Sequence, residues 1–229
     1  MIKYDKQKYD RLKNKFPGSE NIDFNYAQAY QDMFVLSCLN GKRDGYYLEI
    51  GAYHSTNLSN TYLLESKFGW TGISVDIDDS VRNSFSANRE SNLIIGDAIS
   101  LDYKKILKDY NMPKRIDYLQ LDIEPQTNTL ECLKNIPFGE YRFSVITYET
   151  DFYDPSFSRE ESLGNREKSR EILKSHGYFL LVGNVCNISE NDPFEDWYID
   201  PQVIDPNNLS WISPSEEYNM VSESVLLNF

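Results

Sequence analysis

Short apolar runs alternate along the chain with longer segments in which polar residues predominate. The apolar runs predict strands at 46–50, 72–76, 92–95, 116–122, 143–149 and 178–182. The intervening segments have helical spacing or helix-forming composition, and they predict helices at 58–68, 79–88, 103–110, 127–135 and 159–175. Strands that alternate with helices, and that are apolar without strict alternation, are typical of a mostly parallel, doubly wound α/β sheet with helices on both faces.

The two ends of the chain differ from this alternating middle part. Residues 3–16 predict a short polar helix, and 27–39 has the apolar face of a further helix. The C-terminal part is rich in proline and loop-forming residues and carries an aromatic cluster. We expect a single domain over 1–229, with an N-terminal helical segment (1–40), an α/β core that holds the ligand (41–186) and a loop-rich C-terminal cover (187–229).

Charge narrows the possible partners. The formal net charge is -13, because 36 acidic side chains outnumber 23 basic ones. Nucleic-acid phosphates are bound by clustered Lys and Arg, so this balance argues against DNA or RNA as the main partner. No apolar run approaches the roughly 20 residues that span a bilayer, and the charged N-terminus lacks the apolar stretch of a signal peptide. We expect a soluble, cytoplasmic protein with no nucleic-acid partner and no membrane span.

Cysteine and histidine usage excludes two further classes of protein. The three cysteines, Cys38, Cys132 and Cys186, lie far apart and form no Cys-x-x-Cys motif, and the chain has two histidines. A zinc ribbon needs paired thiolates or imidazoles, and a disulfide scaffold needs an even set of cysteines. Both are therefore disfavoured.

An acidic residue stands at the end of each of the first five predicted strands. These acids are Glu49, Asp76, Asp97, Asp122 and Glu149, with Glu124 and Asp151 two residues beyond the last two of them. Ligands of open parallel sheets bind outside the carboxyl ends of the strands, so these acids are expected to share one rim. The alternative interpretation is that they cap helices, which is a common use of Asp before a helix.

A single glycine and one of these acids indicate the kind of ligand. Gly51 follows the first strand and allows a tight turn close to a ligand. No Gly-x-Gly-x-x-Gly is present there, so pyrophosphate binding in the dinucleotide manner is poorly supported. Asp76 ends the second strand and has acceptor oxygens for both hydroxyls of a ribose. Together they favour a nucleoside cofactor without a pyrophosphate, which points to S-adenosylmethionine.

A set of sequence blocks between about residues 28 and 202 carries a resemblance to a known family. The blocks begin with Gln31-Asp32 and continue with GYYLEIGAYHSTNLSNTYLLESKFGWTGISVDID, GDAIS, DYLQLDIEP, FSVITYETDFY, REILKSHGY and PFEDWYIDP. On these blocks the chain resembles the FkbM family of S-adenosylmethionine-dependent O-methyltransferases. It departs from the family at Asp122-Ile-Glu124-Pro125, where Asp-x-Glu-Gly is common. The resemblance implies a Rossmann-like class I methyltransferase fold and a sugar hydroxyl in a glycan or glycoconjugate as the acceptor.

The resemblance also implies which residues bind the methionine end of S-adenosylmethionine. Glu49, Gly51 and Ala52 would flank the methionine part. Asn60 lies in the next predicted helix and would reach the same region. Asp122 would lie beside the sulfonium and the incoming acceptor, where the methyl group is transferred.

Four more residues are implied to bind the nucleoside end. Asp76 would hold the ribose hydroxyls, with Ile77 against the adenine ring. Asp97 and Ala98 would lie at the edge of the adenine that carries the amino group. These positions follow the second and third predicted strands.

Methyl transfer to an alcohol needs help in removing the hydroxyl proton. Asp122, Glu124, Glu149 and Asp151 supply oxygen ligands suited to Mg²⁺, Mn²⁺ or Ca²⁺. Without a metal, carboxylates this close would repel one another, so one would keep a proton at neutral pH and could serve as the base. Asp122, Glu149 and His54 are the candidate catalytic residues, and His54 is equally interpreted as a loop residue that hydrogen-bonds backbone.

Two adjacent aromatic residues in the C-terminal segment are candidates for binding the acceptor. Trp197 and Tyr198 have aromatic faces that match the CH faces of a sugar ring, or else they pin the C-terminal segment in place. The alternatives to a glycan acceptor are a small non-sugar hydroxyl compound and a nucleoside-binding module without catalysis. An NAD-dependent oxidoreductase is a weaker alternative, because the second and third glycines of the dinucleotide fingerprint are missing.

Overall fold

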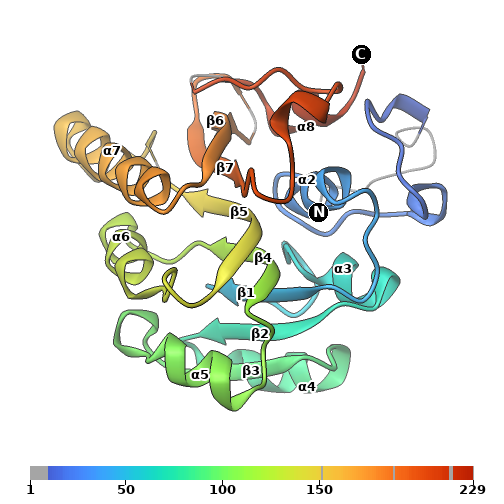
Figure 1. Ribbon diagram of the computed structural model, residues 1–229. Helices are drawn as coiled ribbons and strands as arrows, with labels where there is room; N and C mark the ends of the chain where they lie inside the picture. Colours follow the sequence, from blue (N-terminus) through green and yellow to red (C-terminus); the bar gives the residue numbers. More distant parts are fainter. Residues whose placement is uncertain (1–9, 151, 188, 217–218, 229) are drawn as a thin grey trace.

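The computed structural model describes residues 10–150, 152–187, 189–216 and 219–228. Its centre is a seven-stranded sheet in the order β3-β2-β1-β4-β5-β7-β6 (Figure 1). The strands are β1 (Tyr46–Ile50), β2 (Thr71–Asp76), β3 (Asn92–Ile95), β4 (Arg115–Leu121), β5 (Arg142–Glu149), β6 (Phe179–Cys186) and β7 (Pro193–Ile199). Neighbouring strands from β3 to β5 are parallel, whereas β7 is antiparallel to both β5 and β6.

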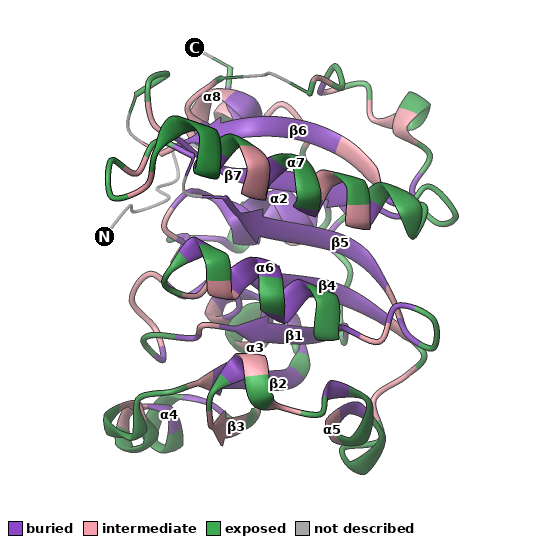
Figure 2. Cartoon of the chain, turned by 90° about the vertical axis from the view of Figure 1, so that its left-hand side faces the viewer, coloured by how far each residue is buried: buried purple, intermediate pink, exposed green. Residues whose placement is uncertain are grey.

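Helices cover both faces of this sheet. They are α2 (Gln31–Cys38), α3 (Tyr62–Phe68), α4 (Arg82–Asn88), α5 (Tyr103–Asp109), α6 (Gln126–Asn135), α7 (Arg159–Ser175) and α8 (Ser222–Leu226). Viewed toward one face, α6 and α7 lie in front of the strands, and α2 and α3 lie behind them (Figure 2). Within the described ranges, no helix combines the length and apolar character that a membrane crossing requires.

The alternation of side chains along the strands divides the core into two clusters. Tyr47 of β1 and Tyr118 of β4 pack with α2 and α3 on one face, whereas Leu48 and Leu119 pack with α5 and α6 on the other. All four are fully buried. Residues that continue the first alternation, including Glu49 and Gln120, therefore lie on the face covered by α2 and α3.

Most predicted elements of the alternating middle part are confirmed. The predicted strands 46–50 and 92–95 and the predicted helix 159–175 have the observed bounds. The long helix begins with a capping box, in which Ser158 and Glu161 bond each other's backbone N–H groups, and such a box marks a helix start in the sequence itself. Helices at 27–39 and 58–68 begin later than predicted, at Gln31 and Tyr62.

The predicted C-terminal cover is wrong for 193–199, which form β7 inside the sheet. All seven residues of β7 are buried, although two of them are acidic. Asp196 is held there by Arg170, whose Nε donates to its Oδ2 at 2.8 Å. The sequence pattern does not show this partner, because Arg170 lies far from Asp196 along the chain. The acidic residues of β7 therefore break the apolar pattern by which a buried strand is predicted. Of the predicted N-terminal helix 3–16, residues 1–9 lie outside the described residues.

Candidate functional site

A cavity of about 480 Å³ lies at the carboxyl ends of the parallel strands. The sequence-predicted residues that line it are Glu49, Gly51, Ala52, Asn60, Asp76, Ile77, Asp97, Ala98, Asp122, Glu124 and Glu149. They come from the ends of β1 to β5 and from the segment before α3. The expectation that the strand-end acids share one rim is therefore met.

The turn after β1 brings backbone to the floor of the cavity. Gly51 has a φ of +85°, and its N–H donates to the carbonyl of Val75 at 2.9 Å. A Cβ atom at this position would stand 1.6 Å from the carbonyl oxygen of Asp122. No side chain larger than hydrogen fits there, so glycine is required for β1 and β4 to approach each other at this level.

Two acids with backbone partners lie at the ends of β2 and β3. Asp76 accepts the N–H of Tyr53 at 2.6 Å and that of Asp78 at 2.8 Å, one on each carboxylate oxygen. Asp97 accepts the N–H of Ile99 at 3.2 Å and caps the short 3₁₀ helix Ala98–Ser100. A carboxylate has about four acceptor positions, so Asp76 keeps capacity for further donors after these backbone bonds.

Glu49 is the acid at the end of β1, and its side chain is enclosed. It accepts hydrogen bonds from the hydroxyl of Thr61 at 2.9 Å and from that of Ser74 at 2.6 Å. Burial raises the pKa of Glu49, while the positive charge of Arg89 and the two hydroxyl bonds lower it in part. Each oxygen of this carboxylate is thus fixed by a hydroxyl donor.

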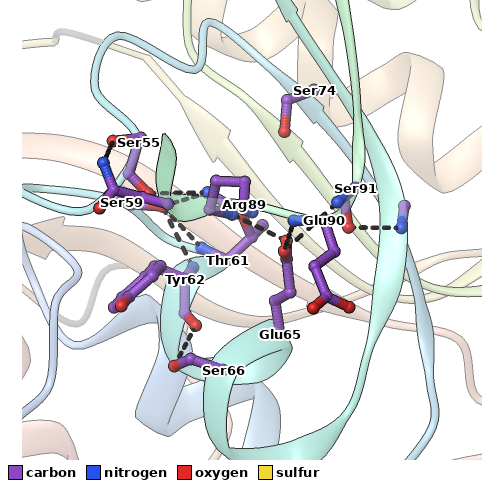
Figure 3. Close-up of polar contacts among 12 residues, drawn as sticks. Ser55, Ser59, Thr61, Tyr62, Glu65, Ser66, Ser74, Arg89, Glu90 and Ser91 are labelled. Carbon is purple, nitrogen blue, oxygen red and sulfur yellow. Dashed lines mark hydrogen bonds and ion pairs between the residues drawn. The ribbon is translucent and has the colours of Figure 1, made fainter. Parts of the chain in front are cut away.

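Arg89 braces this wall of the cavity, and its side chain is fully buried. Its Nε donates to Glu65 at 2.7 Å, and its Nη2 donates to the hydroxyls of Tyr47 and Thr61, each at 2.7 Å. Its Nη1 reaches the carbonyl of Ser55 at 3.1 Å. Figure 3 shows Arg89 between Ser55, Thr61 and Glu65. Arg89 thereby anchors the 55–61 segment, which carries Asn60 into the cavity wall.

A row of acids crosses three neighbouring strands at the other end of the cavity. Leu121 pairs with Tyr148, so Asp122 and Glu149 follow at the same level of β4 and β5, and Glu149 pairs with Glu195 of β7. The side chains of Asp122 and Glu149 share a hydrogen bond, and burial raises the pKa of Asp122. We call Asp122, Glu149 and Glu195 the acid row.

Glu195 was missed by the sequence analysis because β7 was not predicted. It is 1% exposed, and the indole N–H of Trp197 donates to its Oε2 at 2.5 Å. Burial, together with the negative charge of Asp122, raises the pKa of Glu195 to about 8. Glu195 thus carries a proton near neutral pH, behind the two acids that line the cavity.

The predicted metal ligands are only partly brought together. Asp122, Glu124 and Glu149 line the cavity, while Asp151 lies outside the described residues. In the described ranges, no group of three or more His, Cys, Asp and Glu side chains has the arrangement of a metal site. Burial and the charges of Asp122 and Asp154 raise the pKa of Glu124.

Three predicted residues lie away from the cavity. Trp197 and Tyr198 are 0% and 1% exposed in β7, so their interpretation as acceptor-stacking residues is corrected. Trp197 instead stacks on Phe34 of α2 with ring centroids 4.3 Å apart. His54 does not line the cavity, and its Nδ1 accepts the N–H groups of Thr56 and Asn57, both at 3.2 Å. Its arrangement fits the loop interpretation and not that of a catalytic base.

The segment before α2 contributes a lining residue that the sequence analysis missed. Gln28 lines the cavity, and its neighbour Ala27 forms a bridge with Leu58. Buried Asp32 holds this segment, because its Oδ2 accepts the N–H groups of Tyr26 and Ala27 at 2.9 and 3.3 Å. Burial raises the pKa of Asp32 to about 6. Gln31-Asp32 belongs to the blocks that carry the family resemblance, but those blocks do not single out Gln28 as a lining residue.

Several solved structures have a similar arrangement of strands and helices. A protein from Klebsiella pneumoniae assigned as an O-methyltransferase is 13% identical, with a TM-score of 0.52, over 75% of this chain and 80% of that one. Fibrillarin from Methanococcus jannaschii is 21% identical, with a TM-score of 0.47, over 69% of this chain and 67% of that one. Fibrillarin from Aeropyrum pernix with bound S-adenosyl-L-methionine is 14% identical, with a TM-score of 0.46 and the same coverage.

The strand order and the Klebsiella match define the fold. The chain has the class I Rossmann-like methyltransferase fold, in which an antiparallel last strand lies between the fifth and sixth strands. No protein-family model and no curated protein sequence matches the chain. Membership of the FkbM family therefore stays a prediction.

Proposed function

We propose that this protein is an S-adenosylmethionine-dependent O-methyltransferase whose acceptor is a hydroxyl, and we favour a sugar of a glycan or glycoconjugate. The observation that carries the proposal is the convergence of Gly51, Asp76 and Asp122 on one cavity at the strand ends. Open α/β sheets bind their ligands outside the carboxyl ends of the strands, which supports a cofactor site at this rim.

The residues that line the cavity fit the proposed methyl donor. The turn at Gly51 leaves no room for a Cβ atom, so backbone itself forms the surface next to the methionine part. The Oδ1 atom of Asn60 is buried without a hydrogen-bond partner, and an ammonium group would supply the missing donor. Asp76 would accept the ribose hydroxyls. Ile77, which is 73% exposed, would cover the adenine, with Asp97 and Ala98 at its edge.

The donor supplies an electrophilic methyl group, and the protein's own residues have to orient the acceptor and receive its proton. Asp122 lies beside the Gly51 turn and would hold the acceptor hydroxyl next to the methyl donor. Burial raises the pKa of Asp122, which makes its ionised carboxylate a stronger base than an exposed one. When Asp122 is ionised, it can accept the hydroxyl proton.

A divalent cation is the alternative way to activate the acceptor. Asp122, Glu124 and Glu149, with Asp151, carry only oxygen ligands, which suit Mg²⁺ or Mn²⁺. If a metal is required, transfer stops in EDTA and returns with Mg²⁺ or Mn²⁺, and both Asp122→Asn and Glu149→Gln lose most activity. If a carboxylate is the base, EDTA has no effect, and the pH-rate profile reports its raised pKa.

Titration calorimetry tests the cofactor class directly. We expect S-adenosylmethionine and S-adenosylhomocysteine to bind one per chain, and NAD to bind far more weakly, because the turn after β1 has one glycine and no pyrophosphate cradle. Binding of NAD in place of the two adenosyl compounds would contradict the proposal. Failure of all three ligands to bind would contradict it as well.

A further inference from the structure

A row of polar side chains crosses four neighbouring strands, two residues before the acid row in β4 and β5. Ser74 of β2, Glu49 of β1, Gln120 of β4 and Thr147 of β5 are neighbours in the parallel register, and all four are buried. Ser74 donates to Glu49 at 2.6 Å, and the hydroxyl of Thr147 lies 2.7 Å from that of Tyr118. The side chain of Gln120 is the member of this row that still has a donor to use.

The side-chain amide of Gln120 has a fixed orientation. It lines the cavity and is 1% exposed. The N–H of Ile50 donates to its Oε1 at 3.1 Å, which identifies the oxygen and turns it toward β1. Its Nε2 has no acceptor among the described residues, and it is not one of the polar atoms that the protein encloses without a partner. The NH₂ group is therefore open to the cavity, and a donor in such a place calls for an acceptor on whatever binds there.

Any anionic group in this cavity has to be held by neutral donors. The described residues of the lining include no Lys, Arg or His. Asn128 uses its Nδ2 on the carbonyl of Glu124 at 3.3 Å. The other amide side chains of the lining are Gln28 and Asn60, and the buried Oδ1 of Asn60 needs a donor and not an acceptor. The amide of Gln120 is thus the donor whose direction the strand itself fixes.

We propose that the Nε2 of Gln120 donates a hydrogen bond to the α-carboxylate of S-adenosylmethionine. This inference rests on the proposed function, because it concerns the methionine end of the methyl donor in the same cavity. Gln120 pairs with Glu49, and Glu49 accepts the hydroxyl of Thr61, the neighbour of Asn60. The donor of Gln120 and the acceptor of Asn60 therefore border one region, where they distinguish the carboxylate from the ammonium of an α-amino acid.

A carboxylate gains more from this donor than a neutral acceptor does, because charge-assisted hydrogen bonds are the stronger ones. The alternative partner of Gln120 is a hydroxyl oxygen of the methyl acceptor. In that case Gln120 would affect the KM of the acceptor and would have no influence on how the methyl donor binds. Binding measurements without any acceptor separate these two possibilities.

The test compares two ligands that differ in this carboxylate alone. S-adenosylhomocysteine carries it, whereas decarboxylated S-adenosylhomocysteine keeps the ammonium and lacks the carboxylate. In titration calorimetry on the full-length protein, we expect S-adenosylhomocysteine to bind about tenfold or more tightly than the decarboxylated compound.

Replacing the amide assigns this preference to Gln120. Gln120→Met keeps the length of the side chain and removes the NH₂ group, and Gln120→Leu serves if that variant does not fold. We expect the preference to fall to about twofold or less, with the affinity for the decarboxylated compound within about twofold of wild type. As a matched control, Gln126→Met removes an amide of α6 that is 2% exposed and outside the lining, and it should keep the full preference.

Three results would overturn the inference. The first is wild-type protein that binds both ligands equally well. The second is a preference that survives in the folded Gln120 variant. The third is an equal loss of affinity for both ligands, because it would mean that Gln120 only supports β1 through Ile50. Failure of wild-type protein to bind S-adenosylhomocysteine instead overturns the proposed function itself.

Discussion

Two buried glutamates face the same cavity from different ends, and their surroundings are opposite. Glu49 is 2% exposed and has a hydroxyl donor on each oxygen, with the guanidinium of Arg89 behind Thr61. Glu149 is 9% exposed, and its neighbours in the sheet are two further acids, Asp122 and Glu195. The first acid is a fixed part of a wall, whereas the second belongs to a group that can gain or lose protons.

This difference suggests different roles for the two glutamates, with Glu49 shaping the wall of the cavity and Glu149 exchanging protons. A buried carboxylate with a hydroxyl donor on each oxygen keeps its geometry, which suits a residue that shapes a binding surface. Carboxyl groups that share protons respond to the charge of what binds beside them, which suits a residue that exchanges protons with a substrate. Single substitutions beside Glu49 or beside Glu149 test these two roles separately.

The largest effect is expected from removing Arg89. Arg89→Ala would leave the largely enclosed Glu65 without its cation and would remove donors from Tyr47 and Thr61. Breaking a buried ion pair by removing one partner typically costs about 3–5 kcal/mol. We expect a loss of that size in the free energy of unfolding, measured by urea denaturation.

A second arginine in the same region provides the control. Arg82 begins α4 and pairs with Asp79 at the surface, where their side chains are 54% and 71% exposed. Arg82→Ala should cost about 0.2–1 kcal/mol, as exposed pairs do. Equal losses in the two variants would show that Arg89 does not brace the wall.

A smaller effect is expected from Glu195, and it depends on pH. Its pKa in the folded protein is raised to about 8 from an ordinary value of 4.5. Between these two values the unfolded chain loses the proton while the folded protein keeps it, so unfolding becomes easier as pH rises. Below about pH 4.5 both states are protonated and this contribution vanishes, and above about pH 8 it reaches its full size.

Glu195→Gln removes this titration while keeping the acceptor for the indole of Trp197. One pKa unit corresponds to about 1.4 kcal/mol. The free energy of unfolding should fall between pH 5 and pH 8 in wild-type protein, and in Glu195→Gln we expect this fall to be smaller by at least about 1 kcal/mol. Urea denaturation at several pH values measures the slope. Glu171→Gln, at an exposed position of α7, should keep the wild-type slope, and an unchanged slope in Glu195→Gln would contradict the assignment.

Local patterns were sufficient to predict the parallel part of the sheet, where we propose that the nucleoside binds. The strands from β1 to β5 are apolar runs with turn residues after them, and each strand end can be identified by its acid. The acids at Glu49, Asp76 and Asp122 could therefore be assigned to one rim from the sequence alone. Gly51 could be assigned too, because the turn after β1 requires a residue with positive φ.

The acceptor end could not be predicted in the same way, because long-range partners determine it. In β7, Asp196 is buried against Arg170 and Asn184, and Glu195 is buried beside Asp122 and Glu149. These polar residues make Pro193–Ile199 resemble a loop, so the sequence leaves Trp197 open to either acceptor stacking or pinning of the segment, and its place in the core fits the second. Arg89 gave no signal either, since a charged residue after a polar helix is normally exposed.

The central claim is that the strand-end acids form a donor site in which Asp76 anchors the nucleoside. Asp76→Ala removes the acceptor of two ribose hydroxyls, and charge-assisted hydrogen bonds of this kind contribute about 1.5–3 kcal/mol each. Calorimetry with S-adenosylhomocysteine should show affinity reduced at least about tenfold in Asp76→Ala, while the melting profile of this variant stays unchanged. The control variant Asp79→Ala should keep the wild-type affinity. Equal affinity of folded Asp76→Ala and wild-type protein would contradict the account.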